Sequence, residues 1–153
     1  MKLLALVFTM LLAIAAFAAP APSIAETNDP LQQAMRVLDE FMTAFNARDE
    51  EALMATLHFP HVRVASGETR LTATPEAMMS ALDFDQFAKQ FDWHHSAWLS
   101  REVVQSGPDK VHVAVRFARY REDGSVSAEF DSLYIVARRA GRWAVVGRSS
   151  FAP

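Results

Sequence analysis

Two arginines and two acidic residues in the second half of the chain could form a binding or catalytic site. They are Arg116, Glu129, Asp131 and Arg148, and each lies where polar and apolar residues alternate. A guanidinium group binds anionic or carbonyl groups of a ligand, while a carboxylate can orient the ligand or accept a proton from it. Such chemistry requires the four side chains to meet on one face of the fold.

The segment from Trp93 onward is predicted to form four antiparallel strands. Three turn signals separate them, at residues 106–109, Asp123-Gly124 and Ala140-Gly141. If the last two turns are two-residue loops, Arg116 lies opposite Asp131 and Leu133 lies opposite Arg148. The four charged side chains would then share one face of this meander.

Alternation along these strands predicts two faces of different character. The first face is apolar and includes Val113, Val115, Phe117, Phe130, Ser132, Tyr134, Val136, Trp143, Val145 and Phe151. The second face is mixed and carries the four charged residues. In one interpretation the apolar face packs on helices, and the charges form solvated ion pairs of little energetic weight. In the other, the mixed face is concave and lines a pocket, and a second subunit buries the apolar face.

The first half of the chain predicts helices and one hairpin. Asp29-Pro30 is a helix start, because the aspartate caps free amide groups and proline fits the first helical position. The expected elements are a helix over 30–47, a short helix from Asp49 to Pro60, a hairpin over 61–72, and helical segments after Thr74 and Asp83. Helices followed by a meander indicate an α+β fold.

Three segments carry a resemblance to a known family. They are FMTAFNARD at 41–49, LHFPHVRV at 57–64 and GRWAVVGRSSF at 141–151. They resemble the nuclear transport factor 2-like, or SnoaL-like, superfamily, and the resemblance covers nearly all of a single domain over 26–153. It implies a cone-shaped fold with helices packed on a strongly curved antiparallel sheet, an internal pocket, and a homodimer through the sheet. It implies no single chemistry, since the fold carries isomerases, dehydratases, assembly domains and ligand binders.

The resemblance favours the mixed face as the concave one. In the family, the position of Arg148 points into the cavity, and an acidic pocket residue of the ketosteroid isomerase branch falls near Asp131. The expected ligand-binding pocket therefore comprises Arg148, Asp131, Arg116, Tyr134, Trp93 and Trp98, with the aromatic residues included if a bulge turns them inward. A single β-bulge would reverse this assignment of faces.

The catalytic groups of the isomerase branch are not matched. The tyrosine on its first helix is replaced by Phe41, and its general-base aspartate falls at Ala65. Steroid-type isomerisation is therefore not expected, because both the base and the oxyanion donor are missing. The dehydratase branch uses an Asp/His pair, which leaves His61 and Asp131 as candidates for acid–base catalysis.

Composition narrows the function classes further. The chain has 153 residues, a formal net charge of -3 and no cysteine. Mild acidity provides no basic surface for nucleic acid, and the lack of thiols removes disulfides, thiolate metal sites and cysteine nucleophiles. His58 and His61 are separated by Pro60, so they do not form a paired metal site on one helix. We expect no metal and no cofactor.

Residues 1–25 have the pattern of a secretory signal peptide. A basic residue precedes an apolar run, and Ser23 and Ala25 are the small residues that a signal peptidase prefers. Cleavage is expected after Ala25, with Ala19 as the alternative site and an uncleaved membrane anchor as the other outcome. The mature domain, residues 26–153, would then be periplasmic or secreted, without membrane contact.

Three functions remain open at this point. The first is an exported protein that binds a small molecule in an internal pocket through Arg148. The second is a SnoaL-like lyase or isomerase that uses His/Asp acid–base chemistry. The third is a non-catalytic dimeric assembly module, which would have a filled cone and a large apolar interface.

Overall fold

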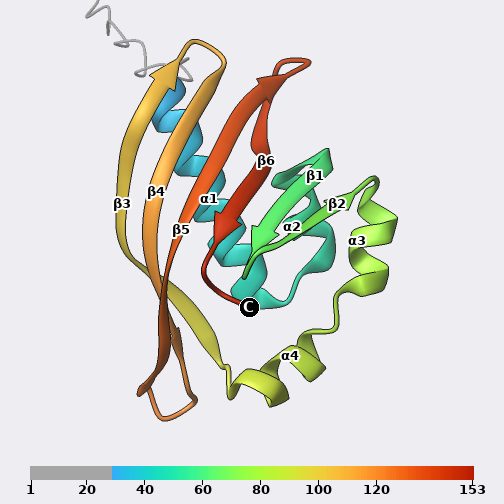
Figure 1. The fold of residues 1–153 in the computed structure, drawn as a ribbon, viewed down its shortest axis with the longest axis vertical. Coiled ribbons are helices and arrows are strands. Elements are labelled where there is room, and N and C mark those ends of the chain that lie inside the picture. Colours follow the sequence, from blue (N-terminus) through green and yellow to red (C-terminus); the bar gives the residue numbers. More distant parts are fainter. Residues whose placement is uncertain (1–28) are drawn as a thin grey trace, which may run out of the picture.

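One curved sheet of six strands and four helices make up residues 29–153, the part of the chain that this computed structural model describes (Figure 1). In chain order the elements are α1 (Pro30–Ala47), α2 (Glu50–Ala55), β1 (Leu57–Ala65), β2 (Glu68–Thr72), α3 (Pro75–Ala81), α4 (Phe84–Phe91), β3 (His95–Gly107), β4 (Lys110–Tyr120), β5 (Val126–Arg139) and β6 (Arg142–Ser150). This α+β order confirms the predicted fold class. The expected signal peptide, residues 1–25, lies outside the described residues.

Side-chain caps begin the helices where the sequence predicts them. Asp29 and Asp49 accept hydrogen bonds from main-chain amides at 3.1 Å and 2.9 Å. Thr74 and Asp83 cap α3 and α4 in the same way. These caps satisfy amide groups that the first helical turn leaves without an intrahelical partner. None of the helices within residues 29–153 is long and apolar enough to cross a membrane.

The strand order is β2-β1-β6-β5-β4-β3, and one pair in it is parallel. The last strand, β6, runs parallel to β1, while every other neighbouring pair is antiparallel. The sheet is therefore mixed, and the expectation of an antiparallel sheet is wrong for this pair. Turn residues specify only strands that are adjacent in sequence, and none of them signals that the last strand lies beside the first.

The concave face of the sheet packs against α1, which passes behind strands β3 to β5 in Figure 1. The buried side chains include Leu38 and Phe41 of α1, Val113 of β4 and Val136 of β5. Burying each large apolar side chain contributes about 1.5–3 kcal/mol. The apolar face thus forms the core beneath the helices, and the prediction of a mixed concave face is wrong.

A β-bulge in β6 separates Arg148 from the other charged residues. Near the turn, β5 and β6 pair as predicted, with Val136 opposite Val145. The register then shifts by one residue at Val146, so that Tyr134 lies opposite Arg148. One inserted residue moves the later side chains to the other face of the sheet. Arg148 therefore points to the concave side together with Tyr134.

The convex face carries the remaining charges in the predicted register. Arg116 lies opposite Asp131. The Nη2 atom of Arg116 donates a hydrogen bond to Glu129 Oε2 at 2.6 Å, and both side chains are exposed. An exposed pair of this kind contributes about 1 kcal/mol or less. The interpretation of these charges as solvated ion pairs is therefore correct for Arg116 and Glu129.

Candidate functional site

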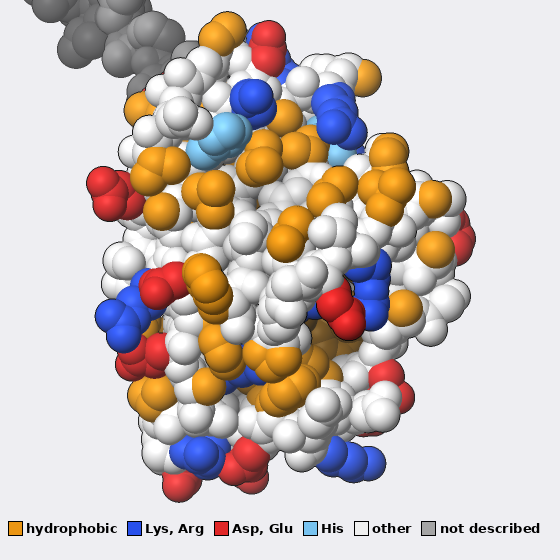
Figure 2. All heavy atoms as spheres, in the orientation of Figure 1, with side chains coloured by type: hydrophobic (Ala, Val, Ile, Leu, Met, Phe, Trp, Pro, Cys, Tyr) orange, Lys and Arg blue, Asp and Glu red, His pale blue; other side chains and the backbone are white. Residues whose placement is uncertain are grey.

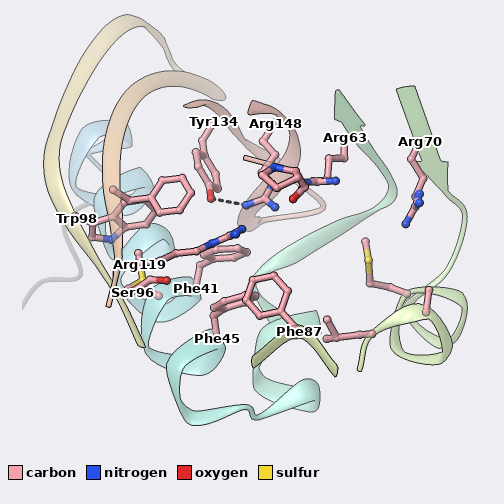
Figure 3. A pocket seen from close by; sticks show the side chains of 16 residues that line it. Phe41, Phe45, Arg63, Arg70, Phe87, Ser96, Trp98, Arg119, Tyr134 and Arg148 are labelled. Atoms are coloured by element: carbon pink, nitrogen blue, oxygen red, sulfur yellow. Dashed lines mark hydrogen bonds between the residues drawn. The ribbon is translucent and has the colours of Figure 1, made fainter. Parts of the chain in front are cut away.

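A cavity of about 190 Å³ lies between the concave face of the sheet and helices α1, α3 and α4 (Figure 3). Its wall is largely apolar and includes Phe41, Met42, Phe45, Met78, Ala81, Leu82, Phe87, Trp98, Phe117 and Tyr134. Its basic side chains are Arg63, Arg70, Arg119 and Arg148, and no acidic side chain of residues 29–153 lines it. A smaller chamber of about 110 Å³ shares Tyr134 and Arg148 with this cavity and adds His61.

Arg148 is held in the cavity by an aromatic pair. Its Nη1 atom donates a hydrogen bond to the hydroxyl of Tyr134 at 2.9 Å. The guanidinium carbon lies 5.7 Å from the centre of the Tyr134 ring and 5.9 Å from that of Phe41. Attraction between a cation and an aromatic ring strengthens when water is excluded. The side chain is thus oriented while most of its donors stay available to a ligand.

Arg119 is the most deeply buried of these cations, with 6% of its surface exposed. It belongs to the inward-facing series of β4, and its guanidinium carbon lies 4.7 Å from the rings of Phe87 and Phe91 and 4.9 Å from that of Phe130. Burial, followed by repulsion from the nearby guanidinium groups, lowers the pKa of Arg119 to about 10. The side chain therefore remains cationic at neutral pH.

Arg63 brings a third positive charge from β1. Its Nη2 atom donates to the main-chain oxygens of Ala152 at 3.1 Å and Pro153 at 2.9 Å. Its Nε atom is buried and has no hydrogen-bond partner among the described residues. Burial, followed by the charge of Arg148, lowers the pKa of Arg63. Parallel pairing of β1 with β6 places Arg63 directly opposite Arg148.

The three guanidinium groups converge with no acidic side chain of residues 29–153 beside them. Figure 3 shows Arg63, Arg119 and Arg148 directed into the same space from three strands. The ion pairs found within residues 29–153 all involve other arginines. Buried charges are normally paired, since removing them from water is costly. Within residues 29–153, these three arginines therefore share a largely apolar cavity and form no ion pair with an acidic side chain.

Two further polar atoms at the cavity have no partner in the described part of the chain. They are Nε1 of Trp98 and Nδ1 of His61. Trp98 packs edge-on against Tyr134, with ring centres 5.7 Å apart. Most buried polar atoms in proteins are hydrogen-bonded, so unpaired atoms at a cavity indicate a ligand or water that completes them. Trp98 lines the main cavity and His61 lines the smaller chamber, and Arg148 lines both.

His61 is the other ionisable group of the site, and only 4% of its surface is exposed. Burial, followed by the charges of Arg148 and Arg63, lowers its pKa to about 4, and a main-chain hydrogen bond with Val145 opposes this effect. The ring is therefore neutral at physiological pH. It can accept or donate a hydrogen bond but does not add a fourth positive charge.

This shifted pKa predicts how stability depends on pH. An unfolded histidine gains a proton near its ordinary pKa of 6.5, whereas His61 in the folded state gains one only near 4. Between these values the unfolded state binds more protons, so acidification through this window destabilises the fold, by at most about 3 kcal/mol from this residue. We expect the free energy of unfolding, measured with urea, to fall more between about pH 7 and about pH 4.5 for the wild type than for His61→Phe. Equal losses would contradict the assignment.

The structure brings together some of the predicted site residues and separates others. Arg148, Tyr134 and Trp98 line the main cavity, and His61 lines the smaller chamber. The prediction that Arg116 and Asp131 line the pocket is wrong, because both lie on the convex face, in a shallow groove. His61 and Asp131 are therefore on opposite faces of the sheet and cannot act as a catalytic pair.

Trp93 is also misplaced by the sequence prediction. It is a core residue, 3% exposed, and does not line the main cavity. Its ring packs edge-on against Phe45 and Phe87, and its Nε1 atom donates to Ser96 Oγ at 2.9 Å. Trp93 therefore supports the wall of the cavity from behind.

Two important cations were missed. Arg119 lies an even number of residues from Val113 and Phe117 in β4, so its side chain is on the same apolar face. A charge on this face is the signal that could have identified Arg119. Arg63 carries no comparable signal, because its proximity to Arg148 depends on the parallel pairing of distant strands. Within residues 29–153, no group of three or more His, Cys, Asp or Glu side chains is arranged to hold a metal ion.

The curled mixed sheet, closed by helices around an internal cavity, defines a cone-shaped α+β protein of the cystatin-like type. Residues 32–151 match the family described as NTF2-like protein (DUF6841), and the chain belongs to this family. The resemblance found in the sequence is thereby confirmed. The chain matched none of the curated proteins in a sequence comparison.

Solved structures share this fold at low sequence identity. An NTF-2 like protein of unknown function from Shewanella oneidensis MR-1 is 15% identical, with a TM-score of 0.64 over 80% of this chain and 99% of that one. An NTF2-like protein from Cytophaga hutchinsonii is 20% identical, with a TM-score of 0.61 over 82% and 99%. A ketosteroid isomerase-like protein from Erwinia carotovora atroseptica is 21% identical, with a TM-score of 0.60 over 81% and 96%. These similarities establish the fold. They do not identify a ligand, which has to be inferred from the residues of the cavity.

Proposed function

We propose that this protein binds a small organic anion with an apolar body inside the cone. The observation that carries the proposal is the convergence of Arg63, Arg119 and Arg148 without an acidic side-chain partner among the described residues. A carboxylate or similar group placed between them would neutralise their mutual repulsion and accept charge-assisted hydrogen bonds. The wall of Phe41, Phe45 and neighbouring side chains would hold the apolar body.

The size of the cavity suits a ligand with about one ring. An apolar cavity of about 150 Å³ is known to hold benzene. The main cavity, at about 190 Å³, is slightly larger, and the chamber of about 110 Å³ beside it shares part of its wall. A benzoate-sized ligand fits this space, and its ring would pack against the aromatic wall. This open space also favours a ligand-binding role over a filled assembly module.

The direct experiment compares three ring-matched ligands by calorimetry and thermal shift. Benzoate is expected to bind and to stabilise the protein, whereas benzamide and benzyl alcohol, which are neutral and of similar size, bind at least about tenfold more weakly. At a ligand concentration about 100 times its dissociation constant, the stabilisation reaches about 2.7 kcal/mol. Absence of binding by benzoate, or equal binding of all three, would rule out the proposal.

An acid–base enzyme is the second candidate, and His61 is the observation that favours it. The fold is shared with a ketosteroid isomerase-like protein from Erwinia carotovora atroseptica. In this chain, however, Phe41 lines the cavity where the isomerase resemblance calls for a tyrosine. A lyase or isomerase reaction would have to use His61 without Asp131. Turnover of a hydroxy acid or keto acid that is lost in His61→Phe would support this candidate.

We also propose a homodimer formed through the convex face of the sheet. Phe151 is 78% exposed and borders a shallow groove with Leu133 and Ala114. Figure 2 shows hydrophobic side chains over the strands, between charged groups. Exposed apolar groups of this kind are suited to a subunit contact. Sedimentation is expected to give a dimer for the wild type and a monomer for Phe151→Asp, and a monomeric wild type at high micromolar concentration would contradict this proposal.

Export is proposed on the pattern of residues 1–25 alone. The expected observation is a mature chain that begins at Glu26, recovered from the periplasm or the medium and identified by N-terminal sequencing. A chain that begins at Pro20 would indicate the alternative cleavage after Ala19. Recovery of the uncleaved chain in the membrane fraction would contradict the proposal.

A further inference from the structure

The smaller chamber contains a hydrogen-bond acceptor that the anion site does not use. His61 is almost fully buried, and its Nδ1 atom has no partner among the described residues. The same chamber is lined by Arg148, Arg63 and Tyr134. A ligand that is anchored by its anionic group at Arg148 is therefore within the same enclosed space as this nitrogen.

The charges around the ring favour a lone pair on its unpaired nitrogen. A neutral imidazole has one N–H group and one nitrogen with a lone pair. Nδ1 of His61 has no partner among the described residues, and the charged side chains that line the chamber are the guanidinium groups of Arg148 and Arg63. A lone pair on Nδ1 is favoured over an N–H group beside these cations. In this tautomer the unpaired atom is an acceptor.

The other polar groups of the chamber do not bond to this acceptor in the structure. The guanidinium groups of Arg148 and Arg63 are donors, but neither is hydrogen-bonded to Nδ1. Among the described residues, the chamber has no acidic side chain. A ligand ammonium group would be repelled by the neighbouring guanidinium groups, whereas a hydroxyl is neutral and donates one hydrogen bond.

From these observations we propose that the ligand is a hydroxyl-bearing organic anion, whose hydroxyl donates a hydrogen bond to Nδ1 of His61. This inference rests on the proposed function and adds a specificity-determining residue to it. The anionic group lies at the arginines, the apolar body lies against the aromatic wall, and the hydroxyl lies in the smaller chamber. A hydroxybenzoate is the simplest compound of this class.

The test uses calorimetry to measure dissociation constants for benzoate, the three isomers of hydroxybenzoate and the three corresponding methoxybenzoates. At least one hydroxybenzoate isomer is expected to bind about tenfold tighter than benzoate, as one buried hydrogen bond provides. The matching methoxy compound, which lacks the donor, is expected to lose this advantage. In His61→Phe the dissociation constants of benzoate and of the preferred hydroxybenzoate are expected to be about equal.

His58→Phe is the matched control for this substitution. His58 is also buried, but its Nε2 atom is already within hydrogen-bond distance of the main-chain oxygens of Ala137 and Arg142, and it does not line either chamber. The preference for the hydroxyl group should be retained in this variant. If the preference is also retained in His61→Phe, or is lost equally in both variants, the inference is wrong.

A measurement on the unsubstituted protein does not depend on the folding of either variant. Nitrogen-15 NMR should report His61 as the Nε2–H form, with a Nδ1 resonance that moves when the preferred hydroxybenzoate is added and not when benzoate is added. An unchanged resonance would overturn the inference. Binding of benzoate without any preference for a hydroxy isomer would overturn it and leave the proposed function standing, whereas failure of benzoate to bind would overturn both.

Discussion

Replacing Arg148 with alanine is expected to weaken benzoate binding by a factor of about 30 to 100. A hydrogen bond to a charged group contributes about 1.5–3 kcal/mol, and this guanidinium is oriented by Tyr134 toward the space that the two chambers share. Calorimetric titration of the wild type and the variant measures the change. A loss of less than about threefold would mean that the anion lies elsewhere.

The matched control for this prediction is Arg116→Ala. Arg116 is also a strand arginine with a hydrogen bond, to Glu129, but it lies on the convex face with 56% of its side chain exposed. Its substitution should change benzoate affinity by less than about twofold. Arg148→Ala should also leave the free protein within about 1 kcal/mol of wild-type stability, because the loss of the Tyr134 contact is offset by less repulsion of Arg63 and Arg119.

Substitution of Gly147 by alanine is expected to have the largest effect on folding, a loss of about 3 kcal/mol in the free energy of unfolding. An added Cβ atom would lie 2.9 Å from the main-chain oxygen of Val62 and 3.4 Å from its Cβ atom. Gly147 is paired with Val62 in the parallel β1–β6 contact, so the backbone on either side cannot move without separating the strands. Urea unfolding of the wild type and Gly147→Ala measures this loss.

Gly107→Ala provides the comparison at a glycine without such a close contact. There the nearest atom to an added Cβ is the main-chain oxygen of Lys110 at 3.9 Å, an ordinary contact distance. We expect the stability of this variant to stay within about 0.5 kcal/mol of the wild type. Equal effects of the two substitutions would show that the β1–β6 contact tolerates a methyl group. A selective effect of Gly147→Ala would show that the pairing that places Arg63 opposite Arg148 depends on this glycine.

Local signals account for the parts of the fold that were predicted correctly. Helix starts at Asp29 and Thr74 depend on capping groups within a few residues, and the β4–β5 register depends on the Asp123-Gly124 turn. The position of the bulge at Val146 has no such local signal. It is consistent with packing between strands that are distant in sequence, including the close approach of Gly147 to Val62. The assignment of faces consequently could not be obtained from the turns alone.

The candidate site was predicted in part, for the same reason. Arg148 and Tyr134 are in the cavity, but they reach it on the apolar face and not on the mixed face to which Arg148 was assigned. Arg116 was predicted because it belongs to the mixed face, opposite Asp131 in the predicted register, and Arg119 was missed. That pairing marks a solvated surface pair, whereas the arginine without an acidic neighbour is the buried one. In this chain the arginine without an acidic partner, and not the paired one, lies in the candidate site.

The bulge at Val146 also determines how homologues should be compared. One residue more or less in β6 decides whether the guanidinium group beyond it faces the interior or the solvent. Sequences with the same arginine can therefore differ in whether this side chain lines the cavity or lies on the convex face, according to the length of the strand. When members of the family are compared, the position of alignment gaps in this strand is therefore more informative than the presence of the arginine itself.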